Sequence, residues 1–448
     1  METKQKKIFI CALPGIGHLN PLLAVANELI RRKYQVIVFC DDIFQETIEK
    51  SGAEYRPYLV KFTIPANGNK SDMDDTQSML MFFFRLVQVA YDDVGYMLDQ
   101  VNRERPDLII YDQFSLTTKY LFKLMEKNYI SKISDLKPPK SICFYTCFAM
   151  RPSIYPDQDQ SKRLLVTDYW DNSFSYNVFN EQVKLCHKYN IEVENPFELA
   201  YNYNTDINIV SSFPRLQPEH KKFDSSFNFV GSCLPSETQK FETVDKKVEN
   251  ILCSFEPINP NFELRELSKK LVYASLGTLF NNKVEVFEKI IESVKNLSKS
   301  LGNLTILISC GKTSLNYLIN KVKSGYDIPE NVILSEFVPQ IEILKRASLF
   351  ITHAGMNSTS EAIHYGLPVI CLPLKADQPL CAIRLVDDFK LGVRLDTEKF
   401  DSKELSEAIS LILNDNSFMT RAIEAAKESR KYNGTLKSIE IIRNYLLD

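Results

Sequence analysis

The first part of the chain alternates short apolar runs with segments of helical periodicity. Strand-like runs occupy residues 7–12, 35–40, 108–112 and 141–145. Apolar positions recur every three to four residues after the first run, and residues from about 76 to 103 carry a longer pattern of this period. Continuous apolar strands that alternate with helices are typical of a parallel sheet covered on both faces. We therefore predict a doubly wound α/β domain.

A second series of the same kind follows a polar stretch. Residues 234–262 are rich in charge, Pro and Asn with weak periodicity, which indicates a connection between domains. The strand-like runs after it are 271–276, 304–309, 331–334, 349–352 and 368–372. The predicted organisation is one domain over 1–240, a linker over 241–262, a second doubly wound domain over 263–430, and an amphipathic helix within 431–448 that could pack back on the first domain.

Two facing doubly wound domains would place a cleft between the carboxyl ends of two parallel sheets, where open α/β folds bind ligands. The overall composition agrees with such a globular protein, since 44% of the 448 residues are hydrophobic and 25% are charged. The 54 basic and 57 acidic residues leave a net charge of -3, which gives no field to attract nucleic acid or an anionic membrane. We expect a monomer that binds neither.

Targeting and metal signals are weak. The start METKQKKIFICALPG places basic residues before an apolar run, but Pro14 and Gly15 break the run and no cleavage site follows. No stretch of eighteen apolar residues occurs, so the expected compartment is the cytosol. The ten cysteines are scattered, and several lie within strand-like runs. We interpret them as reduced core residues, and we predict no zinc site.

The sharpest local feature is the segment 350–379. A strand ends at Thr352, a turn with His353 and Gly355 follows, and a helix begins near Asn357 with Ser358 in its first turn. The free N–H groups and dipole of a helix start bind anions, so a diphosphate suits this turn. Glu361, one turn further on, could accept hydrogen bonds from ribose hydroxyls. The alternative is a helix capped by Asn357 that binds nothing.

Two further segments could join the same site. Asp377 and Gln378 follow the strand-like run 368–372, where a carboxylate and an amide could bind vicinal hydroxyls of a sugar; a helix cap is the alternative. Gly277 and Thr278 end the first strand of the second domain and could approach the phosphates. Pro339 is explained by the first position of a helix without any ligand.

A candidate base lies in the first domain. His18 falls in the turn after the first strand, and Asp112 ends the strand LIIYD, so parallel strands could bring both to one sheet edge. A neutral His that activates a hydroxyl needs a carboxylate to fix its tautomer. A loop histidine without function is the alternative. The glycine pattern around His18 is not a dinucleotide site, because Asn20 stands where a third glycine would be required.

The ordered motifs SLGT, FVPQ, HAGMNSTSEA and DQP, with LPGIGHLNP and RPDLIIYD before them, resemble family 1 UDP-glycosyltransferases. These enzymes have the GT-B fold of two facing Rossmann-like domains, and the similarity runs over essentially the whole chain. Among the branches of this family, the chain looks most like the soluble macrolide-type enzymes of bacteria and their soluble arthropod counterparts. The resemblance implies an N-terminal acceptor domain and a C-terminal UDP-sugar domain.

The resemblance also assigns the nucleotide contacts. It implies that Phe337 stacks on uracil, that the backbone of Val338 reads the base edge, and that Gln340 and Glu361 contact the ribose. Many members have Trp where this chain has Phe337. A Phe still stacks on a base with about 1 to 3 kcal/mol, so uridine binding is expected to survive.

For the rest of the donor, the resemblance implies that Thr278, His353 and Ser358 hold the diphosphate and that Asp377 and Gln378 bind hexose hydroxyls. Met356 stands near the hexose in relatives, where plant enzymes often have Trp. The resemblance makes His18 the general base and Asp112 its support. UDP-glucose is the favoured donor, and galactose and N-acetylglucosamine stay open.

The expected reaction is therefore inverting transfer of a hexose to a hydroxyl of a small hydrophobic acceptor such as a flavonoid, phenolic, macrolide or xenobiotic. The predicted acceptor pocket is lined by Phe83, Phe84, Phe144, Phe148 and Trp170. No cofactor or divalent metal is expected, since the acidic runs at 72–75 and 157–159 read as polar loops. A UDP-sugar 2-epimerase of the same fold and a non-catalytic UDP-sugar-binding protein are the alternatives.

Overall fold

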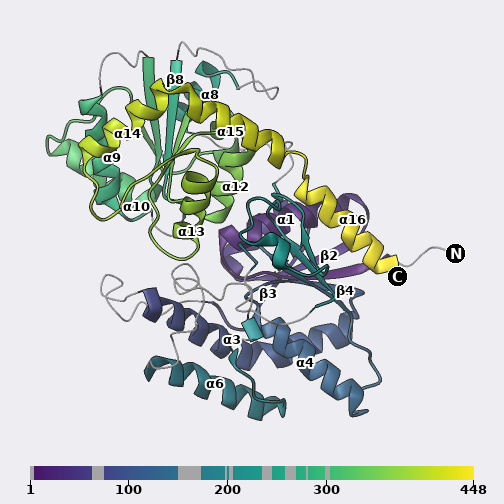
Figure 1. Ribbon diagram of the computed structural model, residues 1–448. Helices are drawn as coiled ribbons and strands as arrows, with labels where there is room; N and C mark the ends of the chain where they lie inside the picture. Colours follow the sequence, from purple (N-terminus) through teal and green to yellow (C-terminus); the bar gives the residue numbers. More distant parts are fainter. Residues whose placement is uncertain are drawn as a thin grey trace. The chain divides into compact units, whose positions relative to one another are not determined.

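The computed structural model describes residues 5–62, 75–149, 173–196, 199–200, 205–234, 245–257, 269–278, 281–297 and 303–447. The chain divides into two compact units (Figure 1). Unit 1 comprises Met1–Pro235 and Asn433–Asp448, and unit 2 comprises Ser236–Tyr432. Each unit is built on a parallel sheet, as the alternating pattern of the sequence predicts.

Unit 1 contains a seven-stranded sheet with the order β3-β2-β1-β4-β5-β6-β7, in which all pairings are parallel. Its helices and strands are β1 (Lys7–Cys11), α1 (Ile16–Arg31), β2 (Gln35–Cys40), α2 (Gln45–Lys50), β3 (Glu54–Pro57), α3 (Asp75–Glu104), β4 (Leu108–Asp112), α4 (Leu116–Ile130), β5 (Lys140–Tyr145), α6 (Ser173–Tyr189), β6 (Ile207–Val210), β7 (Phe227–Phe229) and α16 (Gly434–Leu447).

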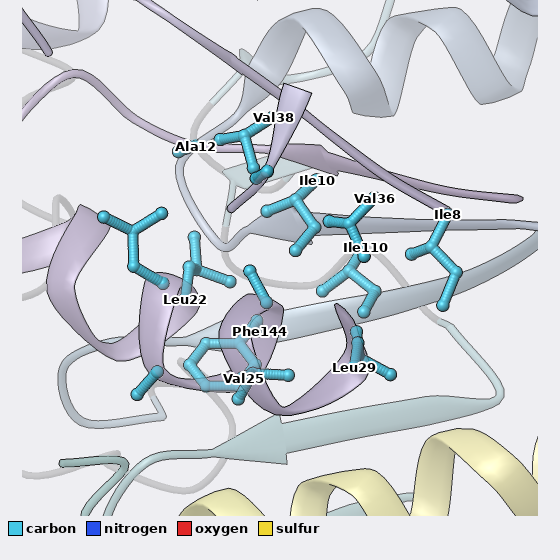
Figure 2. Packing of buried hydrophobic residues seen from close by; sticks show 14 of the residues in the cluster. Ile8, Ile10, Ala12, Leu22, Val25, Leu29, Val36, Val38, Ile110 and Phe144 are labelled. Carbon is cyan, nitrogen blue, oxygen red and sulfur yellow. The ribbon is translucent and has the colours of Figure 1, made fainter. Parts of the chain in front are cut away.

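The two faces of this sheet are buried in different clusters, because successive side chains of a strand point to opposite faces. Figure 2 shows the face toward α1, where Ile8 and Ile10 of β1 point toward the helix residues Leu22, Val25 and Leu29. The residue between them, Phe9, belongs to the other cluster. Burial on both faces explains why the strands read as continuous apolar runs rather than as alternating ones.

The C-terminal helix α16 is part of unit 1. It lies alongside α1 in Figure 1, and its Ile439 and Ile442 are buried in the cluster of Figure 2. The ammonium of Lys140 donates to the carbonyl of Tyr445 at 2.5 Å, and the hydroxyl of Tyr445 donates to Asp206 at 3.1 Å. The last helix of the chain therefore completes the core of the N-terminal sheet.

Unit 2 contains a six-stranded sheet with the order β10-β9-β8-β11-β12-β13, again parallel throughout. Its helices and strands are α8 (Lys246–Ser254), β8 (Lys269–Ser275), α9 (Val284–Asn296), β9 (Asn303–Ser309), α10 (Gly311–Lys323), β10 (Val332–Ser335), α11 (Gln340–Leu344), β11 (Leu349–Thr352), α12 (Met356–His364), β12 (Val369–Cys371), α13 (Gln378–Ile383), β13 (Gly392–Arg394), α14 (Ser402–Asn414) and α15 (Asn416–Ser429).

The segment 241–262, predicted as a linker, contains helix α8. The carboxylate of Asp245 caps this helix by accepting the N–H of Lys247 at 3.0 Å, and Val248 and Ile251 are buried. The helix is nine residues long and rich in Lys, Glu and Asn, so its apolar pattern is too short to distinguish it from a loop in the sequence.

All ten cysteines are free thiols, and eight of them are buried, as expected for reduced core residues. Cys147 is partly exposed and Cys253 is exposed, so the prediction is wrong for these two. Within the described ranges, no helix is long and apolar enough to cross a membrane.

Candidate functional site

Each sheet reverses its strand order at one point, and the predicted residues gather at these two points. In unit 1 the reversal lies between the neighbouring strands β1 and β4, and in unit 2 between β8 and β11. Ligands of open α/β sheets bind at the carboxyl ends of the strands where the order reverses. His18 follows β1 and Asp112 ends β4, while Gly277 follows β8 and His353 follows β11.

The catalytic candidates of unit 1 form a hydrogen-bonded triad. Nδ1 of His18 lies 2.8 Å from Oδ2 of Asp112 and 2.8 Å from Oγ1 of Thr146. The hydroxyl of Thr146 also lies 3.1 Å from the same carboxylate oxygen. Asp112 is fully buried, whereas 27% of the His18 side chain is exposed. The structure therefore brings the predicted pair together and adds Thr146, which the sequence analysis missed although it directly follows β5.

The triad fixes where the imidazole proton resides. The hydroxyl of Thr146 has one proton, which it donates to Oδ2 of Asp112. Its oxygen and Oδ2 are then both acceptors, so Nδ1 of His18 must be the donor between them. The neutral ring consequently carries its proton on Nδ1, and Nε2 is the basic nitrogen. The other oxygen of Asp112 accepts the N–H of Phe114 at 2.9 Å, which holds the carboxylate in place.

An aromatic cluster lies beside His18. The ring of Phe114 packs edge-on against His18 with centroids 6.1 Å apart, and Phe82 and Phe83 of α3 pack against Phe114 at 5.6 and 6.5 Å. Phe62 extends the cluster through an edge contact with Phe82 at 5.7 Å. Of these four phenylalanines, the sequence analysis predicted Phe83 alone.

The other predicted pocket residues fall elsewhere. Phe144 is fully buried in the core cluster against α1 (Figure 2), so its assignment to a pocket is wrong. The reason is the alternation along β5, which turns Phe144 to the α1 face of the sheet and Cys143 and Tyr145 to the other. Phe84 lines a surface hollow with polar residues of α6, Phe148 is buried, and Trp170 lies outside the described residues.

In unit 2, His353 is enclosed between two glycine backbones. A Cβ on Gly277 would lie 2.7 Å from the ring of His353, and a Cβ on Gly355 would lie 2.6 Å from it. Gly277 also has φ +71°, a conformation that favours glycine. Ala354, between His353 and Gly355, has φ 61°, which is unusual for a residue with a side chain. This tight packing fixes the imidazole ring at the start of α12.

Burial lowers the pKa of His353 to about 4, with a smaller opposing contribution from a backbone hydrogen bond at Ser275. The ring is therefore neutral near pH 7 and has a single N–H, which either the backbone of Ser275 or a ligand can accept. The neighbouring N–H groups at the start of α12 supply the positive end of a helix dipole. A neutral donor beside a helix start suits a diphosphate oxygen.

The predicted residues Gln340, Ser358 and Glu361 form one network. Nε2 of Gln340 donates to Oε2 of Glu361 at 2.5 Å and lies 3.5 Å from Oγ of Ser358. The buried hydroxyl of Tyr273 donates to Oε1 of Gln340 at 2.9 Å, and its ring stacks on Phe350 with centroids 5.1 Å apart. Tyr273 was not predicted, because an apolar strand hides a polar role for its hydroxyl. Burial raises the pKa of Glu361 to about 7, against the hydrogen bond from Gln340.

The other residues predicted to bind the sugar nucleotide follow the carboxyl ends of β8, β10 and β11. The ring of Phe337 is 67% exposed although it is large and apolar, whereas Val338 is buried. Thr278 is exposed after β8, and Met356 and Asn357 form the first turn of α12. An exposed aromatic ring beside a polar network is available to stack on a planar ligand.

Gln378 makes hydrogen bonds within its own loop, whereas Asp377 makes no capping hydrogen bond. Oε1 of Gln378 accepts the N–H groups of Leu374 and Lys375 at 2.8 and 3.2 Å, so this oxygen holds the loop. Asp377 stands at the N-cap position of α13, but its side chain makes no capping hydrogen bond. The helix-cap alternative is therefore right about the position of Asp377, but the Asp377 side chain does not act as the cap.

The acidic runs at 72–75 and 157–159 lie outside the residues whose structure is described in full. Among those that are described, no three His, Cys, Asp or Glu side chains gather as metal ligands would.

Comparison with known proteins agrees with this arrangement. Residues 268–427 match the family model "UDP-glucoronosyl and UDP-glucosyl transferase". The chain is 26% identical over 439 residues to the UDP-glucosyltransferase YojK of Bacillus subtilis, covering 97% of this chain and 96% of that protein. It is 28% identical to the NDP-glycosyltransferase YjiC of Bacillus licheniformis, covering 98% of each. Among solved structures, the kitacinnamycin glycosyltransferase has a TM-score of 0.75 at 19% identity, covering 99% of this chain and 100% of that one.

Proposed function

We propose that this chain, whose residues 268–427 match the UDP-glucuronosyl and UDP-glucosyl transferase family model, is a glycosyltransferase that transfers glucose from UDP-glucose to a hydroxyl of a small hydrophobic acceptor with inversion. The family and the two-domain α/β fold that the sequence predicts are confirmed. The observation that carries the proposal is the triad of His18, Asp112 and Thr146, because binding a sugar nucleotide alone would need no such base.

The proton transfer follows from the hydrogen bonds of the triad. Nε2 of His18 accepts the proton of the acceptor hydroxyl as its oxygen forms a bond to the anomeric carbon. The bond from that carbon to the diphosphate breaks, and its electron pair leaves with UDP. The imidazolium that forms keeps its Nδ1 proton on the buried carboxylate of Asp112, which stabilises the positive charge. Attack opposite the leaving group converts an α-linked donor to a β-glycoside.

We assign the donor to unit 2. The neutral ring of His353 and the N–H groups at the start of α12 would stabilise the charge that develops on the diphosphate, with Thr278 and Ser358 as hydroxyl donors. Phe337 would stack on uracil, and Gln340 and Glu361 would bind the ribose. These polar groups need no divalent metal to balance the leaving group.

The identities of the sugar and of the acceptor are inferred from a few side chains in each unit. Asp377 and Nε2 of Gln378 would bind hydroxyls of a neutral hexose, with Met356 near the sugar, which supports glucose. The aromatic cluster of Phe62, Phe82, Phe83 and Phe114 beside His18 supports a flat, apolar acceptor such as a phenolic or flavonoid compound. We propose a role in modifying foreign compounds of this class.

The test is UDP release from UDP-glucose by the purified protein, with and without a panel of phenolic and flavonoid acceptors, followed by the product mass. UDP release that depends on the acceptor and a mass gain of one hexose would support the proposal. Release of UDP without an acceptor, with change of the sugar configuration, would favour an epimerase. Binding of UDP without turnover on any donor or acceptor would favour a sugar-nucleotide-binding protein.

Replacement of Tyr273 by Phe is expected to raise the KM for UDP-glucose about two- to tenfold and to leave kcat nearly unchanged, since one neutral hydrogen bond is lost. Without the Tyr273 hydroxyl, the amide of Gln340 can rotate away from Glu361 and Ser358. Steady-state kinetics with the acceptor held in excess measures both constants. Tyr326→Phe is the control, because that ring packs under Lys295 and Lys321 of α9 and α10. Equal KM values in the two variants would contradict a role for Tyr273.

Donor affinity is expected to rise as the pH increases through about 7. Burial raises the pKa of Glu361 to about 7, so the carboxylate that accepts ribose hydroxyls forms only above this pH. Calorimetric titration with UDP-glucose at about pH 6 and about pH 8 tests this, because its diphosphate does not titrate in that range. Glu361→Gln should remove the pH dependence. A dependence that persists in this variant would exclude Glu361 as its source.

A further inference from the structure

The first turn of α4 contains a buried lysine, Lys119, that has no role in the proposed reaction. Lys119 is 1% exposed, and lysine is almost never buried unless something compensates its charge. Its ammonium donates to two backbone carbonyls, Gln113 at 2.5 Å and Ala200 at 2.6 Å. Both partners are neutral, and within the described part of the chain no carboxylate pairs with this ammonium.

Burial lowers the pKa of Lys119 to about 8, and the negative charge of Asp112 opposes this shift. The ammonium is therefore still protonated at neutral pH. Burying a charge without a contacting counter-ion costs free energy of folding. A negative charge at a longer distance, that of Asp112, offsets part of this cost.

The hydrogen bond from Lys119 to the carbonyl of Gln113 lies on the turn that follows Asp112. Gln113 directly follows Asp112, and its N–H donates to the carbonyl of Phe144 at 3.0 Å. On the other side, Oδ1 of Asp112 accepts the N–H of Phe114, and the carbonyl of Asp112 accepts the N–H of Ser115 at 2.8 Å. Lys119 fixes the one carbonyl between these contacts, so it sets the path of the chain from β4 into α4.

We propose that Lys119 is a positioning residue for the His18–Asp112 pair: its ammonium holds the turn after β4, so that Asp112 stays on Nδ1 of His18, and its positive charge attracts the carboxylate. The inference rests on the proposed function, since it requires His18 to act as the base.

Among the residues that the structure describes, the titratable groups that interact with Asp112 leave Lys119 as the cation, besides His18, that opposes its charge. His18 faces Asp112 from α1, and the thiols of Cys40 in β2 and Cys143 in β5 also interact with it. Burial raises the pKa of Cys143 to about 12 and raises that of Cys40 as well, so both thiols are neutral during turnover. Lys119 is then the charged group, apart from His18 itself, that acts on the carboxylate from α4.

The test compares Lys119→Met with Lys123→Met in the full-length enzyme. Lys123 lies one turn further along α4 and pairs with Glu194 at a partly exposed position, so it controls for loss of a lysine from this helix. For Lys119→Met we expect kcat to fall about three- to tenfold with an unchanged KM for UDP-glucose, because only the acid-base pair is affected. Loss of a nearby positive charge also favours the protonated pair, so the acidic limb of the kcat profile should move about half a pH unit upward.

Lys119→Gln serves as a second neutral variant. Its amide keeps an N–H donor for the two backbone carbonyls, so this variant can be measured if Lys119→Met does not fold. It should show the same upward movement of the acidic limb. A merely structural role would lower the melting temperature without moving that limb, and a profile equal to that of Lys123→Met would overturn the inference. Activity that persists in a His18→Ala variant would instead refute the proposed function, so the two failures are distinguishable.

Discussion

Replacement of His18 by Ala is expected to lower kcat by about 10²- to 10⁴-fold, the usual contribution of a positioned general base. The acceptor hydroxyl would then have to lose its proton to water, while the donor residues of unit 2 stay intact. The KM for UDP-glucose should accordingly change little. Steady-state kinetics with a phenolic acceptor measures the fall, and calorimetric titration with UDP-glucose checks that donor binding survives.

The matched control is His187→Ala. His187 lies in the last turn of α6 on the surface of the same unit, so its loss should leave kcat unchanged. His18→Gln adds a variant that keeps a polar side chain without a basic nitrogen, and it should be as inactive as the Ala variant. Turnover at the wild-type rate in either His18 variant would show that the triad is not the catalytic base.

The parallel sheets could be predicted because their central strands are buried on both faces. Strands such as β1 and β8 appear as unbroken apolar runs, and the long helix α3 was predicted almost to its ends. The missed strands are short and polar or lie toward the sheet edges: β3, β6, β7 and β13. Three or four residues with Asn, Arg or Glu among them carry no apolar run that would distinguish a strand from a loop.

The site was predictable where backbone topology alone decides it. Parallel strands end at one edge, so His18 and Asp112 meet although 94 residues separate them. Thr146 and Tyr273 were missed because their roles depend on which way a hydroxyl points, and the sequence does not contain that information. The error at Phe144 has the same origin, since a shift of one position along β5 exchanges the core face for the opposite face.

The glycines around His353 provide a test of the donor site that keeps every side chain proposed to contact the donor. Three substitutions separate backbone strain from steric overlap. Gly325→Ala adds only strain, because Gly325 has φ +96° and open space around it. Gly355→Ala adds only overlap, with a Cβ 2.6 Å from the ring of His353. Gly277→Ala adds both, since its φ is +71° and its Cβ would lie 2.7 Å from the ring.

Gly277→Ala and Gly355→Ala are both expected to raise the KM for UDP-glucose at least about tenfold, because displacing the enclosed ring removes a hydrogen bond to a charged phosphate, worth roughly 1.5 to 3 kcal/mol. Gly325→Ala should keep the wild-type KM and lose only about 1 to 2 kcal/mol of folding stability from the left-handed backbone. Kinetics and thermal unfolding of the three variants measure these two effects separately. If Gly355→Ala binds UDP-glucose as tightly as the wild type does, His353 does not hold the diphosphate, and the donor must be bound by the network around Gln340 alone.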